Sequence, residues 1–260
     1  MTLAMLLAAD DPTSLIEWLT DSATRVRSGS IPEQAWTTVW HAMAALAVVV
    51  ATMVPLAVVL AHHRKAELVS TWLVNIGRAV PTVTVVGLLV IVSLRNGLGF
   101  EPWPILIALV LLALPPVFTN TYTGVRGVDP GAVDAARAMG LSTTGVMTRV
   151  ELPLALPLIL GGVRTAAVQL LATEPIAAFF GGTGLGLYLY LGLAEDDVYQ
   201  VQAGAVLVCA VALTADLLLA LLSRVLVPRG LRIGAARPGD VSRSRRRPDA
   251  PPAAATAAAS

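Results

Sequence analysis

Residues 127–164 read GVDPGAVDAARAMGLSTTGVMTRVELPLALPLILGGVR, and this polar stretch lies between two long apolar runs. It opens on a turn sequence, Asp129-Pro130-Gly131, and a short helix is predicted from Ala132 to Met139. Gly140 is expected to end that helix in the left-handed conformation that glycine adopts without strain. A second helical piece, Ser142 to Arg149, begins with the side-chain hydroxyls that cap helix N-termini. Such a polar helix-turn-helix between membrane-crossing segments indicates a docking element on one face of the bilayer.

The composition is that of an integral membrane protein with one domain. Hydrophobic residues make up 56% of the chain and charged residues 13%, whereas soluble domains carry about 25% charged residues. The single cysteine, Cys209, excludes an intrachain disulfide. The only lysine, Lys65, follows an arginine, so the chain has no Gly-Lys-Ser/Thr loop to bind ATP phosphates. The chain is therefore predicted not to be an enzyme, and any ATP must be hydrolysed by a partner.

Apolar runs predict an all-α fold with about five transmembrane helices, because a crossing needs roughly 20 apolar residues. Residues 1–34 form an external segment, in which an amphipathic helix from Ser14 to Arg27 is expected to rest on the membrane surface. The transmembrane domain covers 35–232, and the Arg-rich, then Ala/Pro/Ser-rich tail 233–260 is expected to be disordered and cytoplasmic. The predicted crossings are residues 35–62, 80–94, 104–121, 157–180 and 201–226.

Basic residues set the predicted orientation, since they concentrate on the cytoplasmic side. With the polar loop 127–156 inside the cell, most arginines are cytoplasmic, and only Arg25, Arg27 and Arg95 lie outside. Arg78 and Arg164 each precede the outer end of their helix by sixteen residues, about 24 Å. Both side chains are therefore expected to reach toward the inner interface. The chain is predicted to have its amino terminus outside and its carboxyl terminus inside.

The polar loop resembles the Glu-Ala-Ala loop of ABC importer permeases. The matching residues are Asp134, Ala135, Ala136, Gly140, Val150, Leu152 and Pro153, with Asp in place of Glu and Val in place of Ile. The resemblance implies a type I importer (MetI-like) transmembrane domain whose loop is the coupling helix for a cytoplasmic ATPase dimer. It also implies that ATP and Mg are bound by that ATPase, and that this chain has no cofactor of its own.

Further segments resemble permeases of the quaternary-amine uptake group. They are Gly162-Val-Arg-Thr-Ala166, Gly182-Thr-Gly-Leu-Gly186 and Val227-Pro-Arg-Gly-Leu231. This likeness implies uptake of osmoprotectants such as glycine betaine, choline, carnitine or proline betaine across a bacterial plasma membrane. The implied partners are the ATPase dimer, a second permease copy or paralogue, an extracytoplasmic substrate-binding protein and membrane lipid, with no nucleic acid.

Glu174 is the candidate for the translocation path, because a carboxylate inside a membrane helix is costly and often marks a path or a paired site. It precedes Pro175, which frees a backbone carbonyl one turn earlier. Arg78 and Pro81 are added because similar permeases carry Arg-x-x-Pro there. Two hypotheses stay open for Glu174: attraction of a cationic solute, or a hydrogen-bonded structural role.

Two alternative functions remain from the sequence. One is an ABC importer permease for another small solute, such as an amino acid or an anion. The other is an ion-coupled secondary transporter, which places several ionisable groups near the membrane midplane. Against the second, the sequence is interpreted as offering Glu174 alone, with no partner for a proton relay.

Overall fold

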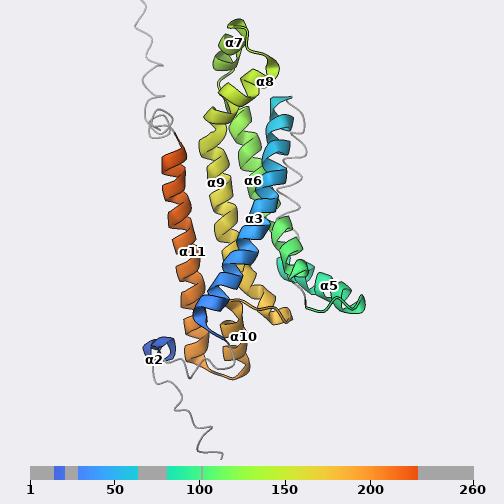
Figure 1. Cartoon of the computed structure of the whole chain (residues 1–260), viewed down its shortest axis with the longest axis vertical. Helices are drawn as coiled ribbons and strands as arrows, with labels where there is room; N and C mark the ends of the chain where they lie inside the picture. Colours follow the sequence, from blue (N-terminus) through green and yellow to red (C-terminus); the bar gives the residue numbers. More distant parts are fainter. Residues whose placement is uncertain (1–14, 21–28, 64–80, 101, 228–260) are drawn as a thin grey trace, which may run out of the picture.

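The computed structural model describes residues 15–20, 29–63, 81–100 and 102–227, and every regular element within these ranges is helical. The molecule is elongated, with its long helices running side by side (Figure 1). The elements are α2 (Leu15–Thr20), α3 (Ile31–His62), α5 (Thr82–Arg95), α6 (Trp103–Arg126), α7 (Pro130–Ala138), α8 (Thr143–Val146), the π-helix η2 (Met147–Glu151), α9 (Leu152–Thr173), the 3₁₀-helix η3 (Glu174–Phe180), α10 (Gly186–Ala194) and α11 (Val198–Leu226).

Helices α3, α6 and α9 form the packed centre of the bundle. The buried side chains along them are small or branched, with Ala42, Ala108 and Ala166 almost fully buried in one cluster. A Cβ at Gly162 of α9 would lie 2.6 Å from Asn120 Cβ and 2.8 Å from Pro116 O, both on α6. Small residues allow such close helix approach in membranes, where packing rather than water exclusion holds helices together.

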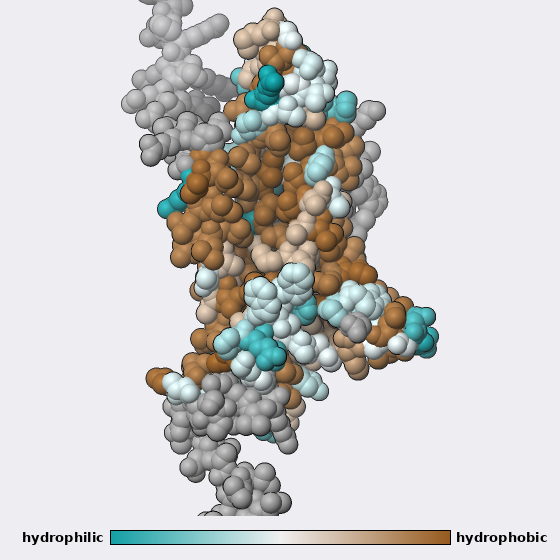
Figure 2. Space-filling model, in the orientation of Figure 1, coloured by the Kyte–Doolittle hydropathy of each residue, from teal (hydrophilic) through white to brown (hydrophobic). Residues whose placement is uncertain are grey.

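Four helical segments are long and apolar enough to cross a membrane: Ile31–His62, Trp103–Arg126, Thr143–Phe180 and Val198–Leu226. They correspond to the first, third, fourth and fifth predicted crossings. The described part of the second is α5, which has 14 residues, or about 21 Å of helix. That is less than the roughly 30 Å hydrocarbon core. The count of five and the orientation stay predictions. Figure 2 shows hydrophobic side chains over the middle of one face and hydrophilic ones toward the ends.

The two ends of the bundle carry different structures. Helices α7 and α8 lie at one end, and α2 and α10 lie at the other (Figure 1). Of the helix predicted from Ser14 to Arg27, the structure describes residues 15–20, which form α2, and its position on the membrane surface stays a prediction. Helix α2 has six residues, and Trp18 is 0% exposed. Its ring meets the Tyr188 ring edge-on, with centroids 5.2 Å apart. Burial of the indole against protein therefore fixes α2. Residues 1–14, 21–28 and 233–260, with their predicted roles, lie outside the described residues.

Candidate functional site

The polar loop begins with the predicted short helix, at a slightly different residue. Asp129 is the N-cap of α7, and its Oδ1 accepts a hydrogen bond from the Gly131 amide at 3.0 Å. Pro130 occupies the first helical position, where its missing N–H costs no bond. The helix therefore starts two residues earlier than the predicted Ala132.

Gly140 ends α7 in the predicted left-handed conformation, with φ +86°. The Leu141 amide donates to the Ala136 carbonyl at 3.2 Å, which satisfies an otherwise free helix-end carbonyl. A Cβ at Gly140 would meet nothing within 4 Å. Backbone conformation, and not space, is therefore what requires glycine here. The next element starts at Ser142, whose hydroxyl caps Gly145 N at 3.2 Å, as predicted.

The matched loop residues divide into an inner and an outer set. Ala136 is 2% exposed and anchors α7, whereas Asp134, Ala135 and Gly140 are exposed. The Asp134 carboxylate lies 3.9 Å from the Arg137 guanidinium, and both side chains are more than half exposed. Such a surface pair contributes little stability. The outer face therefore offers charge and small residues to a partner without strong internal bonds.

The joint between loop and membrane helix differs from the prediction. Residues Met147–Glu151 form a π-helix, which runs into α9 and carries Val150. Pro153 lies in the first turn of α9, where proline is tolerated, beside Leu152. The helical path is continuous from Thr143 to Phe180. The sequence did not indicate the π-helix, a conformation often found at functional sites.

Glu151 and His62 form a pair that sequence reasoning missed. Glu151 is 7% exposed, and its Oε2 lies 2.5 Å from Nδ1 of His62, the last residue of α3. A polar cavity of about 150 Å³ beside them is also lined by Arg126, Asp134 and Arg137. The structure therefore brings Asp134, one of the matched residues, next to the joint. The feature of the sequence that could have indicated this pair is Glu151, a carboxylate immediately before Leu152-Pro153 to which no partner was assigned.

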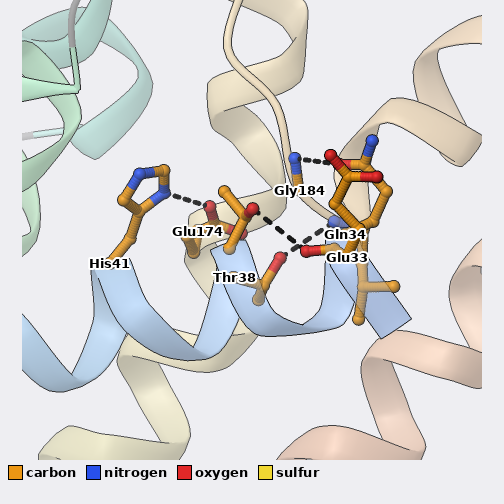
Figure 3. A network of polar contacts seen from close by, with 8 residues as sticks. Glu33, Gln34, Thr38, His41, Glu174 and Gly184 are labelled. Atoms are coloured by element: carbon orange, nitrogen blue, oxygen red, sulfur yellow. Dashed lines mark hydrogen bonds and ion pairs between the residues drawn. The ribbon is translucent and has the colours of Figure 1, made fainter. Parts of the chain in front are cut away.

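Glu174 lies at the opposite end of the same continuous helix, at the start of η3 (Figure 3). It is 0% exposed, and its Oε1 lies 2.8 Å from Nδ1 of His41 on α3. Among the described residues, Oε2 has no hydrogen-bond partner. Pro175 is buried beside it. This contact with a histidine 133 residues away agrees with the hydrogen-bonded role for Glu174, and its place on the translocation path stays a prediction.

The glycine-rich turn after η3 is bound to α3 through the same region. Thr38 Oγ1 accepts from the Leu185 amide at 2.8 Å, and Gln34 Oε1 accepts from the Gly184 amide at 2.7 Å (Figure 3). Gly184 has φ +104°, and a Cβ there would lie 2.7 Å from Thr38 Oγ1 and 3.0 Å from Glu174 Oε1. Both conformation and space therefore require glycine. Figure 3 shows that one helix, α3, supplies all three polar partners.

The other two candidate path residues are Arg78 and Pro81. Arg78 lies outside the described residues. Pro81 is exposed and is the N-cap of α5, directly before the first residue of this helix. A cavity of about 170 Å³ near His41 is lined on α5 by Val86 and Val90, further along that helix.

Arg164 does not reach the interface as a lone side chain. Its Nε and Nη2 lie 2.5 Å and 2.6 Å from the two carboxylate oxygens of Asp216 on α11. Sequence reasoning missed Asp216, although it is the only acidic residue in the predicted span 201–226. A single acidic residue in an otherwise apolar span indicates that a basic side chain pairs with it.

The chain is similar in sequence to known proteins. The family described as binding-protein-dependent transport system inner membrane component matches residues 53–232. The osmoprotectant import permease protein OsmW of Salmonella typhimurium is 33% identical over 193 residues, 74% of this chain and 90% of that protein. The choline transport system permease protein OpuBB of Bacillus subtilis is 34% identical over 179 residues, 69% of this chain and 80% of that protein.

A solved structure shares the fold. An inward-facing structure of the MetNI methionine ABC transporter matches with a TM-score of 0.66 and 19% identity, over 76% of this chain and 96% of the matched chain. The fold of a type I ABC importer transmembrane domain is thus observed as the sequence predicts. The matched region includes the loop, the π-helix joint and the paired carboxylates of Glu151, Glu174 and Asp216. This chain belongs to the family of binding-protein-dependent transport system inner membrane components.

Proposed function

We propose that this permease subunit imports quaternary-amine osmoprotectants, such as glycine betaine, choline, carnitine or proline betaine, in an ATP-driven complex. Similar proteins are named for osmoprotectant and choline transport, and the family is that of membrane transport subunits. One structural observation carries the mechanism. A single helical path, Thr143–Phe180, joins the coupling loop to the buried carboxylate network at the far end.

The loop supplies the coupling surface for a separate cytoplasmic ATPase. Helix α7 lies at one end of the bundle (Figure 1), and Asp134, Ala135 and Gly140 of the loop are exposed. The ATPase binds ATP and Mg, closes as a dimer and moves α7 with it. Ser142 capping and the continuous helix after Thr143 make the connection stiff enough to transmit that movement.

The helix carries this movement across the bilayer to η3. The continuous segment has 38 residues, or about 57 Å of helix. At its far end Glu174 bonds α3, and the glycine-rich turn is held by Gln34 and Thr38. A shift of α9 therefore changes the packing of the end that receives solute. An extracytoplasmic binding protein delivers solute there, and a second permease copy or paralogue completes the pathway.

Transport by purified components tests this function. The chain is reconstituted in proteoliposomes with its partner ATPase and substrate-binding protein, and labelled glycine betaine, choline, carnitine and an amino acid are compared. ATP-dependent uptake of quaternary amines above that of the amino acid supports the proposal. Preferred uptake of the amino acid would contradict the substrate class. Transport by the chain without an ATPase would indicate an ion-coupled transporter instead.

A further inference from the structure

Arg164 and Asp216 form a two-bond ion pair between two helices that are long and apolar enough to cross a membrane. The guanidinium and carboxylate meet at 2.5 Å and 2.6 Å, the geometry that makes such pairs strong and directional. Yet 42% of the Arg164 side chain and 31% of the Asp216 side chain remain exposed. Each charged group therefore has its hydrogen-bonding partner within the chain, but the other helices that the structure describes do not bury the pair.

The pair lies far from both ends of its helices. Asp216 precedes Arg224 by eight residues, about 12 Å of helix, and Arg164 precedes Phe180 by sixteen residues, about 24 Å. Charged side chains at such depth face a protein interior or a water-filled cavity, because exposure to lipid is costly. The exposed part of this pair therefore does not face hydrocarbon.

The surface around the pair mixes polar and apolar side chains. A groove of about 580 Å³ is lined on α9 by the polar residues Thr165 and Gln169 and by Gly161, Val168 and Ala172, beside Arg164. Three and four positions separate these residues, the spacing of one helical face. By contrast, Leu218 and Leu221 of α11 are 61% and 46% exposed and apolar, as a lipid-facing surface requires.

We infer that this groove is part of the wall of the aqueous solute path and that Arg164 and Asp216 form a transient site for a small zwitterion. The inference rests on the proposed function. A solute with both a quaternary ammonium and a carboxylate offers each charge of the pair an opposite partner. Arg164 can then bind the solute carboxylate while Asp216 contacts its ammonium, so that neither charge is left unpaired. Choline has no carboxylate and leaves Arg164 uncompensated when it contacts Asp216. The site therefore favours glycine betaine and carnitine over choline.

Cysteine labelling in the reconstituted complex tests where the groove faces. In a Cys209→Ser background, Thr165→Cys and Gln169→Cys are compared with Leu218→Cys and Leu221→Cys, using a charged, membrane-impermeant methanethiosulfonate. We expect labelling at 165 and 169, slowed severalfold by saturating glycine betaine, and none at 218 and 221. Equal labelling of all four, or none at 165 and 169, would overturn the inference. Disulfide formation between Thr165→Cys side chains of two copies would identify a subunit contact and also overturn it.

Charge variants test the zwitterion site. The double variant Arg164→Gln/Asp216→Asn removes both charges, so neither is left unpaired, and the swap Arg164→Asp/Asp216→Arg retains them. We expect the double variant to raise the KM for glycine betaine about tenfold and that for choline less than threefold. The swap should recover most of the betaine affinity. An unchanged betaine KM in an assembled double variant would refute the site. Absence of ATP-dependent uptake by the wild-type complex would instead refute the proposed function.

Discussion

Nδ1 of His62 lies 2.5 Å from Oε2 of Glu151, so the last residue of α3 is bonded to the last residue of the π-helix that precedes α9. The two side chains are 4% and 9% exposed. This contact joins α3 to the π-helix between the polar loop and α9. If the loop transmits movement from an ATPase, as we propose, it acts on α3 and α9 together, and the pair is expected to matter for coupling more than for assembly.

Replacing His62 with alanine should uncouple ATP hydrolysis from transport. The change leaves Glu151 buried without its partner, which costs about 1–3 kcal/mol locally, and frees the end of α3 from the joint. We expect the ratio of solute imported to ATP hydrolysed to fall at least fivefold, measured in proteoliposomes. His63→Ala is the matched control, because His63 is adjacent but exposed. Equal ratios for the two variants would show that the pair has no role in coupling.

Substitutions at Gly140 separate backbone conformation from space. Gly140 has φ +86°, and a Cβ at this position would have no other atom within 4 Å. Its amide donates to Arg137 O at 2.9 Å. Asparagine tolerates this conformation, whereas proline fixes φ near −65° and has no N–H. We expect Gly140→Asn to retain uptake and Gly140→Pro to lose it while still inserting in the membrane. Uptake by Gly140→Pro at the wild-type rate would argue against a coupling role.

Asp134→Lys tests the outer face of the same loop. Asp134 is exposed and its Arg137 contact is weak, so reversing its charge should leave folding nearly unchanged. If the ATPase binds this face, the substitution should weaken ATPase association, measured by co-purification, and lower uptake at least tenfold. Ala138→Lys on the exposed end of α7 serves as a control for adding a lysine to this helix. Full ATPase recovery with Asp134→Lys would place the docking surface elsewhere.

Local chemistry accounts for what the sequence could predict. Asp129, Gly140 and Ser142 act on neighbours within a few residues, so their turn and cap roles follow from residue type alone. The pairs His62–Glu151, His41–Glu174 and Arg164–Asp216 join residues 89, 133 and 52 positions apart. Hydrophobic periodicity indicates which face of a helix is buried but does not identify the facing helix or its register. These three contacts therefore required the structure.

Glu174 substitutions distinguish a structural role from a place on the solute path. Because the side chain is 0% exposed and bonded to His41, Glu174→Leu should leave the imidazole unpaired and destabilise the protein by about 1–3 kcal/mol. Glu174→Gln retains a hydrogen-bonding oxygen and should cost less. Thermal unfolding in detergent measures both. A raised KM for cationic solute with unchanged unfolding temperature in Glu174→Gln would instead support the path hypothesis.

Adjacent glycines on α9 provide a test of the packed centre. A Cβ at Gly162 would lie 2.6 Å from Asn120 Cβ and 2.8 Å from the backbone oxygen of Pro116, whereas one at Gly161 would meet nothing within 4 Å. Alanine at 162 must push α6 and α9 apart, and overpacking of this kind costs about 1–3 kcal/mol. Alanine at 161 adds a methyl group on an open face and favours the helix slightly. We therefore expect Gly162→Ala to lower the unfolding temperature in detergent, and Gly161→Ala to leave it unchanged or raise it. Equal shifts in both variants would mean that α6 and α9 do not approach as closely in the membrane as the structure shows.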